Sequence, residues 1–307
     1  MRIDTGGRGC RLCPRACGAR RDLGERGFCG ADSTVRVGRA APHLWEEPCI
    51  CAEGGSGAVF FSGCPLGCVY CQNRTIAGGE SGIAVSVEDL AETYLALAAK
   101  GVCNINLVTA GHYAPWVAES LRVAKKKGLA LPVIFNSGGY ESVATLKLLD
   151  GLIDIYLPDF KYTFSSLSKR YSHAEDYPEI AKRSIAEMVR QVGETVWDGV
   201  LLRRGVLVRI LLLPGALIDA KATLRYLFSL YGNRIAYSLM RQYTPPRGME
   251  REYPEIARRV TDAEYFSFVE YARELGVEQG FTQEADSASE SFIPAFDGFG
   301  VCRASGT

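Results

Sequence analysis

The sequence predicts an α/β fold: a partial (β/α)6 barrel preceded by a cysteine-rich N-terminal extension. From residue 58 onward, short apolar and β-branched runs alternate with amphipathic helical patterns. Such alternation builds a parallel sheet through right-handed crossovers. Residues 1–57 lack this alternation and are rich in Gly, Arg and Cys. We therefore expect a metal-binding extension over residues 1–57 and a core domain over residues 58–300.

Six runs in the core region have the composition of strands. Several are continuously apolar, as expected for parallel strands that are covered on both faces. Six strands favour an incomplete barrel over an open sheet. The predicted strands are residues 59–62, 105–109, 132–136, 153–157, 206–213 and 235–240.

Five helices are predicted between and after these strands from their start and stop signals. Ser86, with acidic residues in the following turn, and Thr261, three residues before a Glu, are typical N-caps. Proline commonly occupies the first turn of a helix. The helices are expected from Ser86 to just before Gly101, from Pro115 to about residue 128, from Pro178 to Gly193, over residues 221–231, and from Thr261 to near Gly276.

The overall charge excludes some classes of partner. The 307 residues include 35 Lys and Arg and 35 Asp and Glu, so no net field attracts nucleic acid or a membrane surface. No stretch reaches the ~18 apolar residues of a membrane span, and the first residues lack the apolar run of a signal peptide. We expect a cytoplasmic protein that binds neither membrane nor nucleic acid.

Cysteine is unusually frequent, with eleven in the chain. Seven of them fall in two tight groups before residue 72. Disulfides seldom persist in a reducing cytosol, so clustered cysteines there indicate metal ligands or catalytic thiols. Metal binding is the better interpretation.

The more specific group is Cys64, Cys68 and Cys71, which directly follows the first predicted strand. Three thiolates on one loop can bind three irons of a cubane and leave the fourth iron open to another ligand. Gly63 and Gly67 allow the loop to wrap closely around a cluster. The alternative is a structural zinc site completed by a distant fourth cysteine.

The sequence around these cysteines, Cys-Pro-Leu-Gly-Cys-Val-Tyr-Cys-Gln-Asn from Cys64 to Asn73, resembles the radical S-adenosylmethionine superfamily. Within it, the motif is similar to pyruvate formate-lyase activating enzymes and their uncharacterised relatives, over about residues 10–295. The resemblance implies a barrel of the radical S-adenosylmethionine type with one [4Fe–4S] cluster. It also implies reductive cleavage of S-adenosylmethionine to a 5′-deoxyadenosyl radical that abstracts hydrogen. The implied partners are an electron donor such as flavodoxin or ferredoxin and, as one option, a glycyl-radical protein.

The resemblance also implies cofactor contacts at the ends of the strands, where barrel enzymes gather their chemistry. Asn136 corresponds to the family's Thr-Asn-Gly, and Asp159 and Lys161 correspond to its Asp-Leu-Lys, beside the carboxylate and ribose of the cofactor. Lys161 and Asp159 are therefore the candidate catalytic residues, and Tyr70 is expected against the adenine. Arg209 lies within an apolar run and must meet a partner, either Asp159 or an anionic substrate.

The second strand departs from the family's pattern. It ends in Thr109, Ala110, Gly111 and His112, where the superfamily usually carries Gly-Gly-Glu to hold the methionine amino group. Backbone groups around Thr109 and Gly111 are the expected substitutes, and His112 is placed for a function by its position. Weaker candidates for the substrate side are Gln242, Tyr243, Gln283 and Glu284.

The second cysteine group provides four ligands within twenty residues of the extension, at Cys10, Cys13, Cys17 and Cys29. Four thiolates at loop spacing suit structural zinc or a fully ligated [4Fe–4S] cluster. Zinc would only fold the extension, whereas a second cluster could relay electrons. A set of thiols without metal is the third option.

Three functions remain open at this point. The first is an oxidoreductase related to the glycyl-radical activating enzymes. The second is a radical S-adenosylmethionine enzyme that modifies a small molecule or peptide, which the missing Gly-Gly-Glu keeps open. The third is a non-catalytic iron–sulfur redox protein, although such a protein has no need for Asn136, Asp159 and Lys161.

Overall fold

A computed structural model describes residues 9–51, 53–283 and 293–303. Its described strands form one sheet in the order β10-β9-β8-β6-β5-β4-β2-β1-β3, with β7 paired to β8. The pairs from β2 through β4, β5, β6, β8 and β9 to β10 are parallel. These strands are β2 (Ser56–Phe61), β4 (Ile105–Val108), β5 (Val133–Ser137), β6 (Ile155–Pro158), β8 (Leu201–Leu211), β9 (Ala236–Met240) and β10 (Gly280–Thr282).

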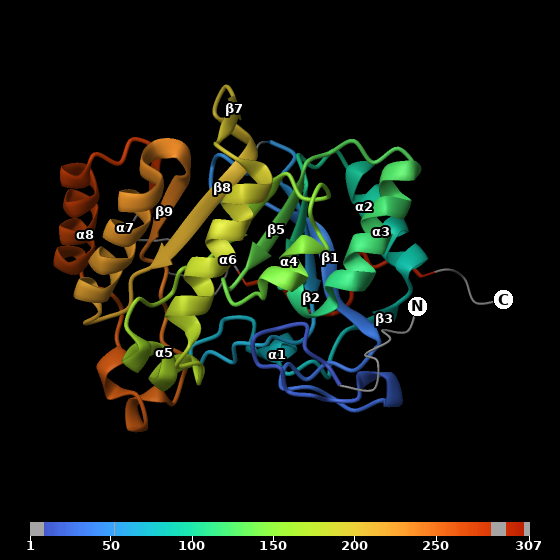
Figure 1. The fold of residues 1–307 in the computed structure, drawn as a ribbon, viewed down its shortest axis with the longest axis horizontal. Helices are drawn as coiled ribbons and strands as arrows, with labels where there is room; N and C mark the ends of the chain where they lie inside the picture. Colours follow the sequence, from blue (N-terminus) through green and yellow to red (C-terminus); the bar gives the residue numbers. More distant parts are fainter. Residues whose placement is uncertain (1–8, 52, 284–292, 304–307) are drawn as a thin grey trace.

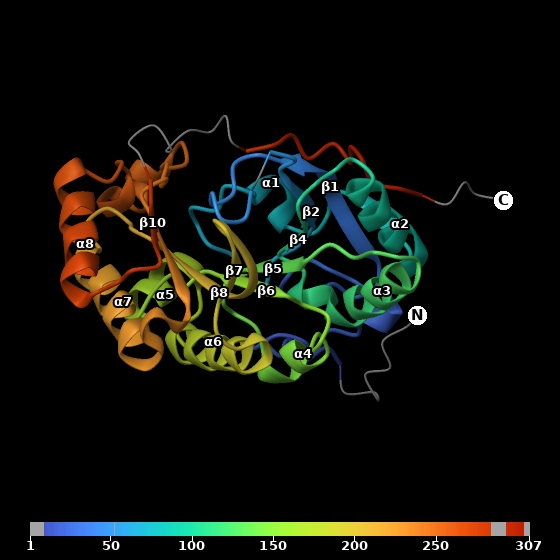
Figure 2. The ribbon, with the colours of Figure 1, turned by 90° about the horizontal axis from the view of Figure 1, so that it is seen from above.

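Helices cover the outer face of this curved sheet, and the sheet does not close (Figure 2). The first six parallel strands are each followed by a helix, so the predicted partial (β/α)6 barrel is confirmed. The six helices are α2 (Val87–Ala98), α3 (Ala114–Lys126), α4 (Val143–Lys147), α6 (Tyr177–Val192), α7 (Leu217–Tyr231) and α8 (Asp262–Leu275).

Each predicted strand overlaps an observed one, but several bounds were wrong. The largest difference is in β8, which spans 201–211 rather than 206–213. Short elements without a strong periodic pattern were missed. These are β1 (Val35–His43), β3 (Ile83–Val85), β7 (Val196–Asp198), β10, α1 (Arg74–Ala77), α4, α5 (Ser165–Ser172) and the 3-10 turns Arg21–Leu23, Gly111–Tyr113, Gly232–Arg234, Met249–Arg251 and Pro254–Ile256.

The alternation of side chains along the strands creates two apolar layers. Side chains such as Phe135 and Tyr156 point outward and pack with the helices in the main core. Their neighbours Ile134 and Ile155 point inward and form a second cluster with Cys49 and Ile50. The concave face is therefore a packed interior, filled in part by the loop that follows β1.

The strand β1 belongs to the predicted extension but pairs antiparallel with β2 over the register from Val37↔Phe61 to His43↔Ser56. It carries the chain back to the amino ends of the parallel strands, so the loop at 44–51 can enter the concave face there. The second half of residues 1–57 is thus built into the sheet. The predicted boundary between an extension over residues 1–57 and a core domain over residues 58–300 stays a prediction, because it concerns whether the two parts fold independently.

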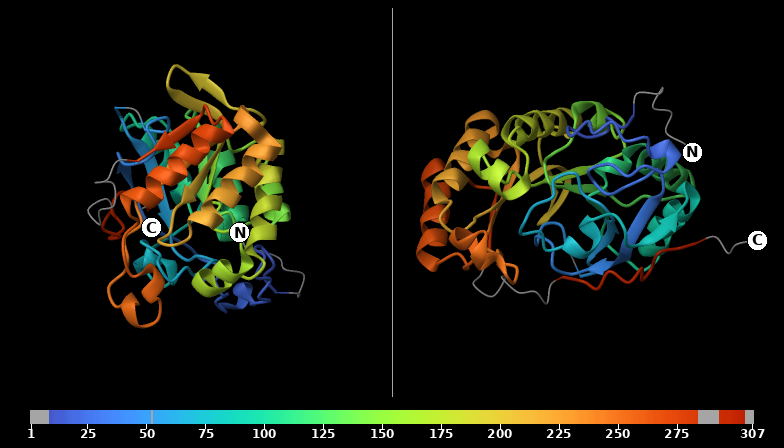
Figure 3. Two further views of the ribbon diagram at one scale, coloured as in Figure 1. Left: turned by 90° about the vertical axis from the view of Figure 1, so that its left-hand side faces the viewer. Right: turned by 90° about the horizontal axis from the view of Figure 1, so that it is seen from below.

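The N-terminal segment at 9–34 lies at the opposite end, beyond the carboxyl ends of the strands, with α1 and α5 (Figures 1 and 3). The buried side chain of Arg21 anchors it: Nη1 donates to His112 O (2.7 Å), and Nε and Nη2 donate to Asp32 O (2.8 and 2.6 Å). The guanidinium also lies over the rings of Tyr113 and Trp116, 5.4 Å from each centroid.

The imidazole of His112 is buried beneath the loop that follows β2, with 1% of the residue exposed. Its Nε2 is 2.8 Å from Ser62 O. Burial lowers the pKa of His112 to about 3, because the interior disfavours the charged ring. These contacts give His112 a packing role.

Within the described residues, every helix is too short or too polar to cross a membrane.

Replacing Ser86 by Ala should lower the free energy of unfolding by about 1 kcal/mol. Ser86 Oγ accepts from Asp89 N–H (3.0 Å), and Asp89 Oδ2 accepts from Ser86 N–H (2.9 Å), so the change removes half of a capping box. Urea unfolding measures the effect. The control is Ser229→Ala, an exposed position in α7 where Ala should not destabilise the helix. Equal losses in both variants would contradict the capping role.

Replacing His112 by Gln should remove a dependence of stability on pH. The folded pKa of about 3 lies below the usual 6.5, so on acidification the unfolded chain takes up the proton first. The stability contributed by the neutral ring is complete above pH 6.5 and is lost as the pH falls towards 3, by up to about 1.4 kcal/mol per pH unit. Urea unfolding of both proteins at pH 7.5, 6.0 and 5.0 tests this, because other titrating groups cancel in the difference. An identical slope for the two proteins would refute it.

Candidate active site

The loop between β2 and α1 carries Cys64, Cys68 and Cys71 at the carboxyl end of β2. Gly63 and Gly67 adopt φ values of +93° and +67°, which favour glycine, so the loop can turn sharply on both sides of Cys64. The sulfurs are already hydrogen-bonded: Leu66 N–H points at Cys64 Sγ (3.5 Å), and Ser172 Oγ donates to Cys68 Sγ (3.0 Å). Donors of this kind stabilise thiolates that bind iron.

The thiols are buried, and one cation lies near all three of them. Burial raises the pKa of Cys64 to about 11 and of Cys71 to about 12, and the neighbouring Lys161 ammonium acts in the opposite direction on both and on Cys68. In the described residues, no three His, Cys, Asp or Glu side chains are arranged to hold a single metal ion. A cubane does not require such convergence, because each of its cysteines binds a different iron.

Asp159 and Lys161 lie together at the end of β6, as the sequence predicts. Lys161 Nζ is 2.5 Å from Asp159 Oδ2, and Arg209 Nε is 2.8 Å from Asp159 Oδ1. Arg209 Nη2 also donates to Asn136 Oδ1 (2.6 Å). Of the two partners expected for Arg209, the structure shows Asp159. Four residues named from the sequence thus form one hydrogen-bonded group.

This group keeps Asp159 ionised although it is almost buried. Its side chain is 17% exposed and that of Lys161 is 14% exposed. Burial alone would raise the pKa of Asp159, but Arg209 and Lys161 outweigh it and hold the pKa below the usual value. Lys161 is likewise kept charged by Asp159 against the effect of burial.

Sequence reasoning missed two acidic residues that reach this group from the loop after β1. Glu46 Oε1 accepts from Asn106 Nδ2 (3.0 Å) and from Asn136 Nδ2 (3.4 Å), and Glu46 Oε2 is 3.7 Å from Arg209 Nη1. Burial raises the pKa of Glu46 and of its neighbour Glu47. The one available signal was Asn106, a polar residue inside an apolar strand that had to find a partner.

The inner wall also holds polar atoms without partners. Among the residues that the structure describes, Asn106 Oδ1 and Glu47 Oε2 are buried and accept no hydrogen bond. Buried polar atoms of this kind usually meet water or a bound molecule.

Tyr70 is buried, and its hydroxyl is already engaged. Its oxygen is 2.5 Å from Tyr162 Oη, which is 2.9 Å from Ser172 Oγ, which in turn donates to Cys68 Sγ. The ring packs edge-on against Tyr243, with centroids 5.8 Å apart. A chain of hydroxyls therefore ends on a cysteine sulfur. Contact between Tyr70 and an adenine stays a prediction.

Thr109 and Gly111 lie at the end of β4 but line a small cavity to which Asp159, Lys161 and Arg209 do not contribute. Thr109 has φ +60°, and its N–H donates to Asn136 O (2.8 Å). With Cys13 and Glu141, both residues line a cavity of ≈ 10 Å³. Burial raises the pKa of Glu141 to about 8. A carboxyl group thus lies next to Gly111 although the local motif has none, and the cofactor role of Thr109 and Gly111 stays a prediction.

The weaker candidates for the substrate side form hydrogen bonds within the protein. Gln283 Oε1 accepts from the N–H groups of Arg241 and Gln242 (2.9 and 3.2 Å), and Tyr243 Oη donates to Ile256 O (2.6 Å). Glu284 lies outside the described residues.

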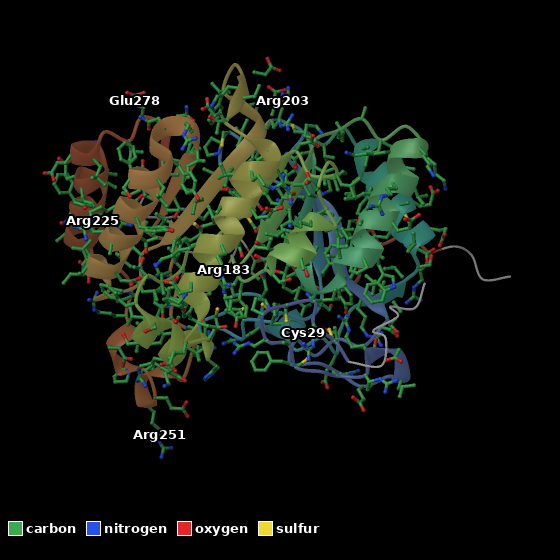
Figure 4. The ribbon with its side chains drawn as sticks, viewed as in Figure 1. Cys29, Arg183, Arg203, Arg225, Arg251 and Glu278 are labelled. Atoms are coloured by element: carbon green, nitrogen blue, oxygen red, sulfur yellow. The ribbon has the colours of Figure 1, made fainter. Side chains whose placement is uncertain are left out.

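The second cysteine group gathers at the same end of the sheet, where Figure 4 labels Cys29. Sulfurs of Cys17 and Cys29 flank Gly27, at 3.1 and 3.5 Å from the position that a Cβ would take there. Burial raises the pKa of Cys13 to about 12, and the nearby Cys29, Cys10 and Cys17 add to it. The four predicted ligands are thus neighbours, and metal binding by them stays a prediction.

Known proteins resemble this chain only at low sequence identity. No family model matches the chain. An uncharacterized protein of Methanocaldococcus jannaschii, MJ0674, is 26% identical over 290 residues, which cover 88% of this chain and 75% of that protein. Among solved structures, methylornithine synthase (PylB) is similar with a TM-score of 0.46 and 14% identity, over 71% of this chain and 68% of that one. At these values the structural similarity is not evidence for a shared activity.

Proposed function

We propose that the chain is a radical S-adenosylmethionine enzyme whose Cys64, Cys68 and Cys71 hold a [4Fe–4S] cluster. The observation that supports this most is the position of the three-cysteine loop beside the buried group of Asp159, Lys161 and Arg209 at one end of the sheet. A zinc site or a simple electron carrier has no use for such a group. When bound, the cluster and S-adenosylmethionine supply reductive cleavage and, through it, hydrogen abstraction.

The residues of the chain would bind and orient the cofactor. Lys161 offers a cation to the cofactor's carboxylate. Asp159 limits the movement of the Lys161 side chain, because the two residues form an ion pair. Arg209 holds Asp159 from the other side and fixes Asn136. Ser172, through its bond to Cys68 Sγ, would stabilise the thiolate form of that ligand.

The finer assignment to glycyl-radical activation rests on the sequence resemblance around Cys71, Gln72 and Asn73. The second candidate is modification of a small molecule or peptide, which the unpartnered oxygens of Asn106 and Glu47 favour, because a substrate with hydrogen-bond donors would satisfy them. Incubation with a deuterated glycyl-radical protein and, separately, with deuterated amine or amide compounds would distinguish the two. The true substrate is the one whose deuterium is transferred to 5′-deoxyadenosine. In either case a flavodoxin or ferredoxin is the electron donor that we propose.

Replacing Cys64, Cys68 or Cys71 by Ala should remove about four irons per chain and abolish cleavage of S-adenosylmethionine, because the cubane then lacks a ligand. Iron analysis and detection of 5′-deoxyadenosine after dithionite reduction measure both effects. Cys103→Ala is the control, since Cys103 bonds to Gly55 O at the other end of the sheet. Retained cleavage in any of the three variants would refute the assignment.

Replacing Lys161 by Ala should weaken binding of S-adenosylmethionine by ~1.5–3 kcal/mol, the value of a charge-assisted hydrogen bond. Iron content should not change, because Lys161 is not a cluster ligand. Calorimetry or equilibrium dialysis on the reconstituted protein measures the affinity. Lys221→Ala, in α7 beside Ser267, is the matched control. Unaltered affinity together with unaltered turnover would make Lys161 an ordinary loop residue.

A further inference from the structure

The two cysteine groups are in direct contact. Cys64 N–H donates to Cys29 O (3.2 Å), so the backbone of one predicted ligand bonds to that of the other. A Cβ at Gly63 would lie 2.6 Å from the same oxygen, which leaves no room for a side chain there. The cavity of ≈ 10 Å³ that Cys13 and Pro65 both line has space for about one water. The two cysteine loops are therefore in contact through their backbones.

Arg15, between Cys13 and Cys17, fixes this contact. Its guanidinium donates to Pro65 O (2.9 Å), Leu66 O (3.1 Å) and Ser172 O (2.9 Å), and also to His173 O. It lies 4.0 Å from the centroid of the Phe28 ring. One side chain of the N-terminal segment thus ties together the loop of Cys64 and the end of α5, whose Ser172 bonds to Cys68.

Arg21 indicates that the second group carries negative charge. It is 1% exposed, and its hydrogen bonds go to the carbonyl oxygens of Asp32 and His112 and, at 3.8 Å, to Cys10 Sγ. Across residues 9–51, 53–283 and 293–303, it forms no ion pair with a carboxylate. A buried charge is costly without a counter-charge. Besides the phenol of Tyr113, the groups next to it that can become anionic include the sulfurs of Cys10 and Cys29, and metal-bound thiolates would supply the missing charge.

We propose that Cys10, Cys13, Cys17 and Cys29 hold a second [4Fe–4S] cluster that passes electrons to the cluster at Cys64, Cys68 and Cys71. The relay rests on the proposed function. Four thiolates suit zinc and a cluster alike, but only a cluster can accept an electron, and Cys29 is hydrogen-bonded to Cys64 of the radical loop. The hydrogen bond between Cys29 and Cys64 would place the two clusters next to each other.

The step transfers one electron and no atoms. A low-potential protein donor, such as a reduced flavodoxin or ferredoxin, is oxidised by one electron, and the N-terminal cluster is reduced by it. The same electron then reduces the radical cluster, and the N-terminal cluster returns to its oxidised form. No proton or leaving group is involved.

The test compares anaerobically reconstituted wild type with Cys17→Ser, chosen because Cys17 is exposed, and with the triple variant Cys64→Ala, Cys68→Ala and Cys71→Ala. Wild type should hold about eight irons and each variant about four. After dithionite reduction, electron paramagnetic resonance of wild type should show two magnetically coupled clusters, and each variant should show one uncoupled cluster. Cys103→Ala should behave as wild type.

A second measurement isolates the relay. Reduction of the radical cluster, followed by its visible bleaching, should be lost or greatly slowed in Cys17→Ser when a reduced flavodoxin is the donor, but not with dithionite, which is small enough to act directly. One zinc with four irons, only four irons in wild type, or equal flavodoxin-driven rates in both proteins would overturn the relay. None of these three results would contradict the proposed function. The proposed function is refuted instead if the triple variant keeps all the irons of wild type.

Discussion

The ion pairs of Asp159 with Lys161 and Arg209 are the interaction on which the site depends. Each cation pairs with a different oxygen of the Asp159 carboxylate, so the three side chains fix one another, and a carboxylate without both cations would be an unpaired charge in a largely buried region. Through Arg209 the group reaches Asn136 and Glu46, and therefore connects strands β5, β6 and β8 with the loop after β1. The polar interior of the barrel is one network.

A second set of arginines fixes the opposite boundary of the site. Arg15 and Arg21 donate mainly to backbone carbonyl oxygens, and carbonyl groups do not depend on the identity of the side chain that carries them. Guanidinium groups suit this task because several donors leave one plane in fixed directions. The N-terminal segment, which has little apolar core of its own, is thereby held against the barrel by a few directional bonds and by the stacking of Arg21 on Tyr113 and Trp116.

The periodic elements and the residues at the ends of strands were accessible from the sequence. The predicted strands and capped helices follow local rules, and polar residues at the ends of neighbouring parallel strands must meet at one edge, as Asn136 and Asp159 do through Arg209. Short elements such as β3 and β7 were missed because three residues carry no measurable periodicity. Glu46 and Glu47 were missed because they lie in an irregular segment, where no periodic pattern indicates which side chains point into the barrel.

The sequence by itself determined the fold class, the two cysteine groups and the candidate site residues Asn136, Asp159 and Lys161. The fold class and the cysteine groups follow from local patterns of apolar residues and from ligand spacing, whereas the three site residues follow from the resemblance to the family's motifs at the ends of strands. Only the tertiary structure decided that Arg209 pairs with Asp159, that Glu46 enters the barrel and that Cys29 bonds to Cys64. Each of these contacts joins residues that are tens to more than a hundred positions apart. They form because the curved sheet brings distant segments together and because buried charges and polar groups must find partners there, and no local pattern records which partners these are.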